Sequence, residues 1–475
     1  MSQLDQIIRG GTVVTHEHVG IADLGIAHGK IAALSPRIAT PAREEIDATG
    51  LHIFPGLIDS HVHFNDPGRA YWEGIATGSR ALAAGGGTMF FDMPLNSSPP
   101  TLDGKSFDAK LRVAKETSFT DFALWGGLTP GNLDRLEELA ERGVIGFKAF
   151  MANSGIEDFS CVDDPTLGKG MKRAAKLGKL VAVHAESETI TSALTQGALA
   201  GNRTSVSDYL ASRPIRAELD AIQRAIALAA ETGCALHIVH VSCGAGVAFV
   251  AAAKQQGVDV TCETCPHYLV LTEADVEKLG AVAKCAPPLR TQAAQDSLWQ
   301  HVVNEAVSTI GSDHSPSPPT MKRGKNFFKI WGGISGVQHT LPLLFTRGSR
   351  GHAALTSKSQ ADQSLLTSAA TKDQEDPTLS LIARLTSFNV VERFDLPRSK
   401  GRIGIGADAD FALVDLKQKF TVRTKNLFYR HKRSPYLGRA LTGRVVRTIL
   451  RGRTIFHNGQ LVGEPGGRFV EPLRN

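Results

Sequence analysis

The sequence predicts an α/β protein: a parallel (β/α)8 TIM barrel with a smaller β domain made from both chain ends. Three observations carry this prediction. Eight short apolar segments each close on polar residues, helix-like stretches separate most of them, and both ends are rich in β-branched residues and glycine turns. Apolar runs that alternate with helical stretches are typical of parallel sheets covered by helices. A doubly wound open sheet is the alternative, but no Gly-x-Gly-x-x-Gly phosphate loop follows the first segment.

The two ends of the chain predict a small β-sandwich domain from residues 1–53 and 401–475. Strand-like runs cover 7–14 and 26–31 near the N-terminus, with glycine turns between them. Similar runs cover 410–414 and 445–456, and an Asn458-Gly459 turn follows. One domain assembled from both termini accounts for these hairpins most simply.

The barrel is expected from residues 54–400. A helix with 3.6-residue periodicity is expected over 132–140, between two of the apolar segments. The polar stretch 356–377 has few large apolar residues, so it is interpreted as a mobile surface insertion with no catalytic part. The eight apolar segments lie at residues 56–64, 88–94, 121–128, 146–150, 180–186, 235–242, 258–268 and 307–315.

Composition and charge narrow the class of protein. The 475 residues are 42% hydrophobic, which is enough for a large core. The net charge is +6, but 53 basic residues are interleaved with 47 acidic ones, so no nucleic-acid partner is expected. Six cysteines in so long a chain do not predict a disulfide framework. The N-terminus has no signal-peptide pattern and no apolar run approaches the ~20 residues of a membrane helix, so a cytoplasmic protein without a membrane partner is expected.

The first apolar segment ends in His61-Val62-His63, which is the most informative triplet of the chain. Side chains along a strand alternate between faces, so both imidazoles are expected on the same face. Two such rings at a strand end can bind one divalent metal ion. Taken alone, a His-x-His pair is more often a surface or hydrogen-bonded core feature.

Polar side chains also end four later segments. The carboxyl ends of barrel strands meet at one rim, which is where barrel enzymes carry their chemistry. Each of these residues alone has an ordinary structural interpretation, but together with the two histidines they predict a metal centre. The four residues are Lys148, His184, His240 and Asp313.

Lys148 indicates the type of centre. It lies among apolar neighbours, in Gly146-Phe147-Lys148-Ala149-Phe150, where burial favours the neutral amine. A neutral amine can add carbon dioxide to form a carbamate, whose two oxygens can bridge two metal ions. Two metal ions can together generate a nucleophile from water and polarise a carbonyl. Asp313 could then move a proton from that water to a departing nitrogen.

Four motifs carry a resemblance to a known family. They cover residues 55–68, 92–97, 263–269 and 311–316, and the chain resembles the cyclic amidohydrolase branch of the amidohydrolase superfamily over nearly its whole length. The resemblance implies that His61, His63, Lys148 (as N6-carboxylysine), His184, His240 and Asp313 hold two divalent metal ions. Zinc is expected, and cobalt, iron, manganese or nickel also suit this mixed ligand set. A homotetramer is expected on the same ground.

Asn65 bears on the choice among cyclic amides. Dihydroorotases typically have an arginine here, which pairs with a substrate carboxylate, and hydantoinases and dihydropyrimidinases usually have an aspartate. A neutral cyclic ureide, a hydantoin ring with a ureido group, is therefore the expected substrate. The alternatives are a hydantoinase or dihydropyrimidinase acting on related rings and, more remotely, a non-catalytic scaffold. The resemblance puts Asn96, Cys285 and Ser315 near the substrate, although these could equally be loop-stabilising groups.

Overall fold

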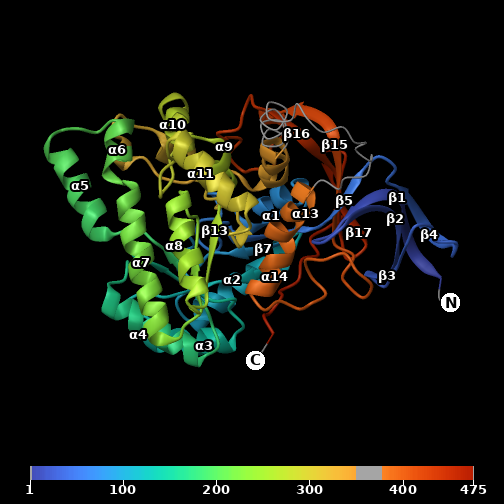
Figure 1. Cartoon of the computed structure of the whole chain (residues 1–475), viewed down its shortest axis with the longest axis horizontal. Coiled ribbons are helices and arrows are strands. Elements are labelled where there is room, and N and C mark those ends of the chain that lie inside the picture. Colours follow the sequence, from blue (N-terminus) through green and yellow to red (C-terminus); the bar gives the residue numbers. More distant parts are fainter. Residues whose placement is uncertain (1–2, 349–376, 474–475) are drawn as a thin grey trace, which may run out of the picture.

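The structure, a computed structural model, describes residues 3–348 and 377–473 (Figure 1). A barrel surrounded by helices forms one part, and strands from the two chain ends, blue and red in Figure 1, lie beside each other at its side. Most of the polar stretch predicted to be a mobile insertion, residues 356–376, lies outside the described residues. Pro377 begins helix α13 (Pro377–Ala383).

Two parallel sheets form the barrel, which confirms the predicted fold class. One has the order β6-β7-β8 and the other β14-β13-β12-β11-β10-β9. They meet where Val62 pairs with His314 and where the His63 amide donates to the His314 carbonyl at 2.8 Å. Strands β8 (Asp121–Leu124) and β9 (Gly126–Gly127) both lie within the predicted segment 121–128 and together fill one of the eight strand positions. The other strands are β6 (Leu57–Val62), β7 (Gly87–Asp92), β10 (Phe147–Phe150), β11 (Val181–His184), β12 (Leu236–Ile238), β13 (Val260–Thr264) and β14 (Thr309–Ile310).

The seventh predicted segment is too long at its carboxyl end. Strand β13 stops at Thr264, and residues up to Tyr268 belong to helix α9 (Pro266–Val270) instead. Proline has no N–H for a sheet ladder and is well suited to the first turn of a helix. Pro266 therefore ends the strand region and starts the helix.

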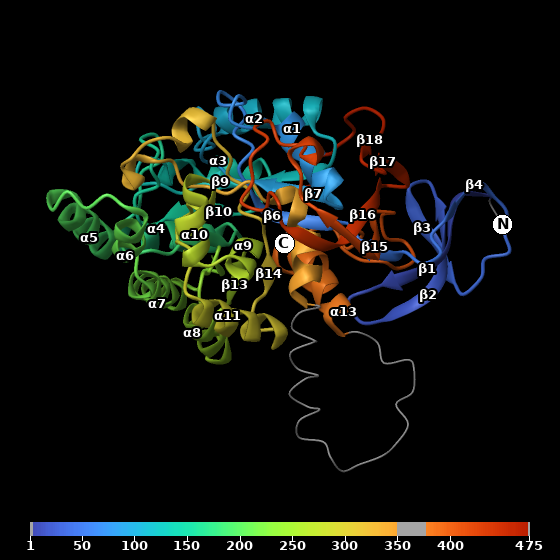
Figure 2. The ribbon, with the colours of Figure 1, turned by 90° about the horizontal axis from the view of Figure 1, so that it is seen from above.

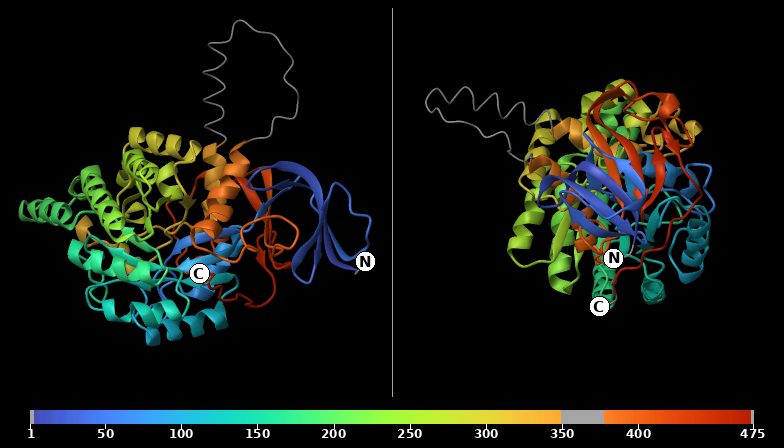
Figure 3. Two further views of the ribbon diagram at one scale, coloured as in Figure 1. Left: turned by 60° about the horizontal axis from the view of Figure 1, so that its bottom comes forward. Right: turned by 90° about the vertical axis from the view of Figure 1, so that its right-hand side faces the viewer.

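Helices cover the outside of the barrel, as Figures 2 and 3 show from further directions. Helix α4 is representative: Asp163 caps its N-terminus by accepting from the Thr166 amide at 2.9 Å, and its buried face includes Leu167 and Met171. The predicted helix over 132–140 is a 3-10 turn (Leu133–Arg135) followed by α3. The main helices are α1 (Ile75–Ala84), α2 (Gly104–Thr117), α3 (Leu136–Glu141), α4 (Asp164–Lys176), α5 (Glu188–Ala200), α6 (Val206–Ser212), α7 (Ile215–Thr232), α8 (Gly244–Gln255), α10 (Glu273–Leu279), α11 (Gln292–Val303) and α14 (Asn389–Arg393).

Across residues 3–348 and 377–473, no helix combines the length and the apolar character that crossing a membrane requires.

Strands from both chain ends share one nine-stranded sheet. Its order is β18-β17-β16-β15-β5-β1-β2-β3, with β4 paired to β1. The two halves join where β5 pairs antiparallel with β15, with Ile53 opposite Leu413. The division of the chain at 53/54 and 400/401 stays a prediction. The strands are β1 (Leu4–Val14), β2 (Val19–Ala27), β3 (Lys30–Ser35), β4 (Ala42–Asp47), β5 (His52–Pro55), β15 (Phe411–Thr421), β16 (Ala440–Leu450), β17 (Arg453–His457) and β18 (Gln460–Leu461).

A tight turn divides the predicted strand at 26–31, and that prediction is wrong. His28 and Gly29 both have positive φ, 52° and 75°, and they connect β2 to β3. Two-residue hairpin loops favour this conformation because its twist matches that of the flanking strands. The expected Asn458-Gly459 turn has the same form, with φ of 48° and 86°, and connects β17 to β18.

Lys400 ties the barrel to the terminal sheet through three carboxylates. Its Nζ lies 2.6 Å from Asp121 Oδ2, 2.8 Å from Asp410 Oδ2 and 3.0 Å from Asp408 Oδ2, and its side chain is 6% exposed. Asp121 begins barrel strand β8, whereas Asp408 and Asp410 precede β15. One buried ammonium therefore neutralises acidic groups from both parts of the molecule.

We expect Lys400→Met to lower the free energy of unfolding by about 3–5 kcal/mol, because it leaves the buried Asp410 carboxylate without its cation, whereas Asp121 keeps Arg451 and Asp408 keeps Lys30. Guanidinium unfolding of both proteins measures the change. Lys30→Met is the matched control: its Nζ is also 2.8 Å from Asp408, but the side chain is 52% exposed. An exposed pair contributes under about 1 kcal/mol. Equal losses in the two variants would show that burial of Lys400 is not what matters.

Candidate metal centre

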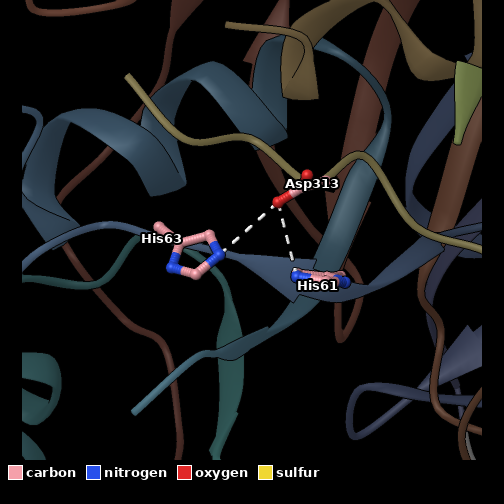
Figure 4. A group of neighbouring side chains, drawn as sticks. All are labelled: His61, His63 and Asp313. Atoms are coloured by element: carbon pink, nitrogen blue, oxygen red, sulfur yellow. Dashed lines mark ion pairs between the residues drawn. The ribbon is translucent and has the colours of Figure 1, made fainter. Parts of the chain in front are cut away.

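Three predicted ligands meet at the carboxyl end of the barrel. Strand β6 ends at Val62, so His61 is its last residue but one and His63 comes directly after the strand. Asp313 lies three residues beyond the end of β14. Asp313 Oδ1 is 3.4 Å from His61 Nε2 and 3.4 Å from His63 Nε2. Figure 4 shows both rings turned toward this carboxylate. One ligand atom from each residue lies within 4.8 Å of the others, so these three residues could hold a metal ion.

His184 and His240 form a second pair beside the first. His184 ends strand β11, and its Nδ1 lies 3.0 Å from His240 Nε2. The His240 ring is also 5.5 Å from the His61 ring, centroid to centroid. The structure thus brings all four predicted histidines together on one rim.

Lys148 lies on strand β10 (Phe147–Phe150), near Asp313, His184 and His240. It is fully buried, and its Nζ has no hydrogen-bond partner among the described residues. Burial lowers the pKa of its amine to about 7, although Asp313 and Glu263 nearby oppose that change. A buried amine without a partner is costly. Its position fits a group that is completed by carbon dioxide and metal ions.

The protonation states of the histidines and of Asp313 at the rim favour binding of divalent cations. Burial lowers the pKa of His63, His184 and His240, so these rings are neutral near pH 7. Burial alone would raise the pKa of Asp313, but His61 and His63 hold it well below its usual range. Neutral imidazoles and an ionised carboxylate are the forms that bind metal. This nitrogen-rich set fits zinc and similar transition metals better than calcium or magnesium.

Two buried carboxylates orient two of the four histidine rings by hydrogen bonds. Glu263, on strand β13, has Oε1 2.8 Å from His61 Nδ1, and Glu186 has Oε2 2.9 Å from His184 Nε2. Each pairing assigns the ring proton to the nitrogen beside the carboxylate, so the other nitrogen, which faces Asp313 in His61 and His240 in His184, carries a lone pair that could bind a metal ion. Gly311 makes room for Glu263, because a Cβ there would lie 2.6 Å from Glu263 Oε2.

Sequence patterns alone do not assign a role to either carboxylate. The spacing of Glu186 could have indicated its role. It lies two residues after His184, and side chains two residues apart along a strand point to the same face. Glu263 lies inside a motif that carried the family resemblance, but the sequence does not show that it faces His61, 202 residues away.

Several residues at the site have strained backbones. His240 and Asp313 have φ of +42° and +43°, and Asn65 and Asn96 have φ of +70° and +67°. Positive φ is uncommon for residues other than glycine and costs on the order of 1–3 kcal/mol. Such conformations cluster at functional sites, where the surrounding fold holds a side chain in a required direction.

A cavity of about 530 Å³ opens over the two histidine pairs. Asn96, Cys285 and Ser315 line it, and Asn96 Nδ2 lies 3.5 Å from Ser315 Oγ. Asn65 is buried but is not among the lining residues, so its contact with substrate stays a prediction. The rest of the lining includes Phe150, Asn153, Arg213, Lys284 and the segment from Phe328 to Gly333.

Comparison with known proteins identifies the family. The model of the amidohydrolase family matches residues 52–455. The chain belongs to the amidohydrolase family. Amidohydrolases from two bacteria, both named allantoinase, are similar over the full length: that of Rubrobacter xylanophilus is 54% identical, covering 100% of this chain and 99% of the relative. That of Deinococcus radiodurans is 50% identical, covering 99% of each.

Solved amidohydrolase structures share the whole fold. The L-hydantoinase (dihydropyrimidinase) from Arthrobacter aurescens superposes with a TM-score of 0.90 at 32% identity and covers 99% of this chain and 100% of that one. The dihydropyrimidinase from Brevibacillus agri gives 0.87 at 32% identity, with 99% of each chain covered. The barrel with a β-rich domain predicted from the sequence is confirmed, as is the family resemblance.

Proposed function

We propose that this protein is a metal-dependent hydrolase that opens the hydantoin ring of allantoin to give allantoate. The observation that carries the proposal is full-length similarity to allantoinases, at 54% and 50% identity, and it is supported by a cavity that His61, His63, His184, His240 and Asp313 line together. The complete set of ligands also counts against a non-catalytic scaffold.

The proposed centre holds two divalent metal ions, zinc being the expected species. Its ligands are His61, His63, His184, His240, Asp313 and Lys148 in the form of N6-carboxylysine. In the carbamate, the lysine nitrogen bonds to the carbon of CO2 and releases one proton. When bound, the metal ions supply a nucleophile from water at neutral pH and polarise the ring carbonyl.

The side chains of the protein supply the rest of the chemistry. Asp313 stays ionised at neutral pH, so one of its oxygens can accept the proton of the attacking water and pass it to the departing ring nitrogen. Asn96, Ser315, Cys285 and Asn65 are the proposed substrate contacts. Neutral amide and hydroxyl groups suit a cyclic ureide, which has several N–H donors and carbonyl acceptors and no carboxylate.

The second candidate function is that of a hydantoinase or dihydropyrimidinase. The two solved structures described above have these names, and each is 32% identical to this chain. Their identity to this chain is well below that of the allantoinases, which favours allantoin as the substrate.

Measuring the hydrolysis of allantoin, hydantoin, dihydrouracil and dihydroorotate by one enzyme preparation distinguishes the two candidate functions. We expect kcat/KM for allantoin to exceed that for hydantoin and dihydrouracil by at least about tenfold, a difference of about 1.4 kcal/mol in transition-state binding. Dihydroorotate should not be hydrolysed, because Asn65 cannot pair with its carboxylate as an arginine would. A preference for dihydrouracil or hydantoin would replace this proposal by the second candidate.

A cytoplasmic location and a homotetramer are also proposed, by similarity to the family. Gel filtration with light scattering measures the assembly directly.

A further inference from the structure

One wall of the cavity is a segment with little regular structure. It runs from Phe327 to Gly333, and all but its first residue line the cavity. Residues Phe327–Lys329 form a single 3-10 turn, and no strand follows within the segment. Backbone carbonyls in such a segment need partners from elsewhere, because unpaired buried carbonyls are costly.

Lys284 supplies three of those partners. Its Nζ donates to the carbonyls of Phe327 at 2.7 Å, Phe328 at 3.3 Å and Ile330 at 2.5 Å. Its own carbonyl accepts from the Gly333 amide at 2.7 Å. Three N–H groups directed at three carbonyls are the full donor capacity of a lysine ammonium. Lys284 therefore binds the segment at both ends.

Lys322 holds the other half of the segment. Its Nζ donates to the carbonyls of Trp331 at 2.9 Å and Gly333 at 2.7 Å, and to that of Ala281 at 3.2 Å. The two lysines together bind five of the seven carbonyls from Phe327 to Gly333. Gly333 must be a glycine here, because its φ is +134° and a Cβ would lie 2.1 Å from the Ser315 carbonyl oxygen.

The surroundings of Lys284 suit a held cation. Its Nζ lies 4.4 Å from the centre of the Tyr209 ring and 5.2 Å from that of Phe327. The residue is only 4% exposed, so its ammonium depends on these carbonyls and rings in place of water. Lys284 is buried and Lys322 is partly buried, and the carbonyls to which both donate belong mainly to one cavity wall.

We propose that Lys284 and Lys322 are positioning residues that fix the wall from Phe327 to Gly333 and thereby set how tightly the site binds its substrate. Neither ammonium touches the reacting atoms in this account. Both act through the wall, which lines the same cavity as the histidine pairs. The inference rests on the proposed hydrolysis of a cyclic amide, since the wall would contact that ring.

Kinetics of Lys284→Met and Lys322→Met test the proposal, with allantoin or whichever cyclic amide the wild type hydrolyses. We expect KM to rise about tenfold or more, because small displacements of a binding wall are costly. The kcat and the metal content should stay close to those of the wild type. Lys325→Met is the matched control, because Lys325 is exposed on the same loop. An unchanged KM, or loss of metal from the lysine variants, would overturn the proposal.

Limited trypsin digestion gives a readout that needs no substrate. Lys329 is an exposed residue within the wall, so cleavage after it reports how firmly the wall is held. We expect this bond to be cut about tenfold faster or more in Lys284→Met and Lys322→Met than in Lys325→Met, because local opening becomes easier. Equal cleavage rates would overturn the proposal even if the substrate proved to be a different ring.

Chemical rescue separates the ammonium itself from a general packing effect. In Lys284→Ala the missing atoms correspond to n-propylamine, whose ammonium form has three N–H donors. We expect added n-propylamine to lower KM toward the wild-type value, whereas tetramethylammonium, which has no N–H donor, should not. Rescue by both cations, or by neither, would contradict the proposed role of the three carbonyl contacts.

Discussion

Replacing Lys148 with alanine should give a folded protein that retains at most a trace of metal and has almost no activity. The amine is fully buried on β10 near Asp313, His184 and His240, and its carbamate would supply the metal centre with a ligand that no other residue of the set replaces. We expect kcat to fall by at least about three orders of magnitude, because both metal functions are lost together. Metal analysis and allantoin turnover on the same sample measure the two effects.

The matched control for Lys148→Ala is Lys172→Ala, which removes an exposed lysine from the outer face of helix α4. That variant should keep wild-type metal and activity. Added short carboxylates such as propionate should restore part of the activity of Lys148→Ala, since they can occupy the place of the carbamate. Full activity of Lys148→Ala without any added carboxylate would refute the carbamate.

Asp313→Asn is expected to have the second largest effect. The amide keeps the shape of the side chain but cannot accept the proton that the reaction moves. General acid–base groups contribute about 10²–10⁴-fold, so kcat should fall within that range. KM should change far less, because the cavity wall around Asn96 and Ser315 is unchanged. Steady-state kinetics on enzyme of known metal content measures both constants.

Asp158→Asn controls for the loss of a carboxylate outside the cavity. Asp158 is exposed, its Oδ2 lies 3.6 Å from Arg69 Nη2, and it is not among the residues that line the cavity. Its kcat should stay within about twofold of the wild type, as is usual for an exposed ion pair. If Asp313→Asn keeps its metal and is as active as Asp158→Asn, another group must move the proton.

The barrel could be predicted because its strands are short apolar runs that end in polar residues. His61 and His63 could be assigned to one face because side-chain alternation along a strand is a local property. The extent of the seventh segment was predicted wrongly, since its composition stays apolar past Pro266 while the backbone changes from strand to helix.

The supporting groups could not be predicted in the same way. Glu263 orients His61 across a separation of 202 residues, and the pairing depends on how β13 and β6 lie in the closed barrel. Lys284 and Lys322 bind carbonyls of an irregular segment, whose path is not encoded by any periodic pattern. Contacts of this kind depend on tertiary structure and are visible only in the folded chain.

The central claim is a pair of metal ions held by four imidazoles, Asp313 and a carboxylated Lys148. Its most direct test is reconstitution of the wild-type apoprotein with zinc in the presence of ¹³C-labelled bicarbonate. The account predicts that activity saturates at two zinc ions per chain and that a carbamate carbon signal grows in parallel. Saturation at a single zinc ion, or full activity without a carbamate signal, would contradict it.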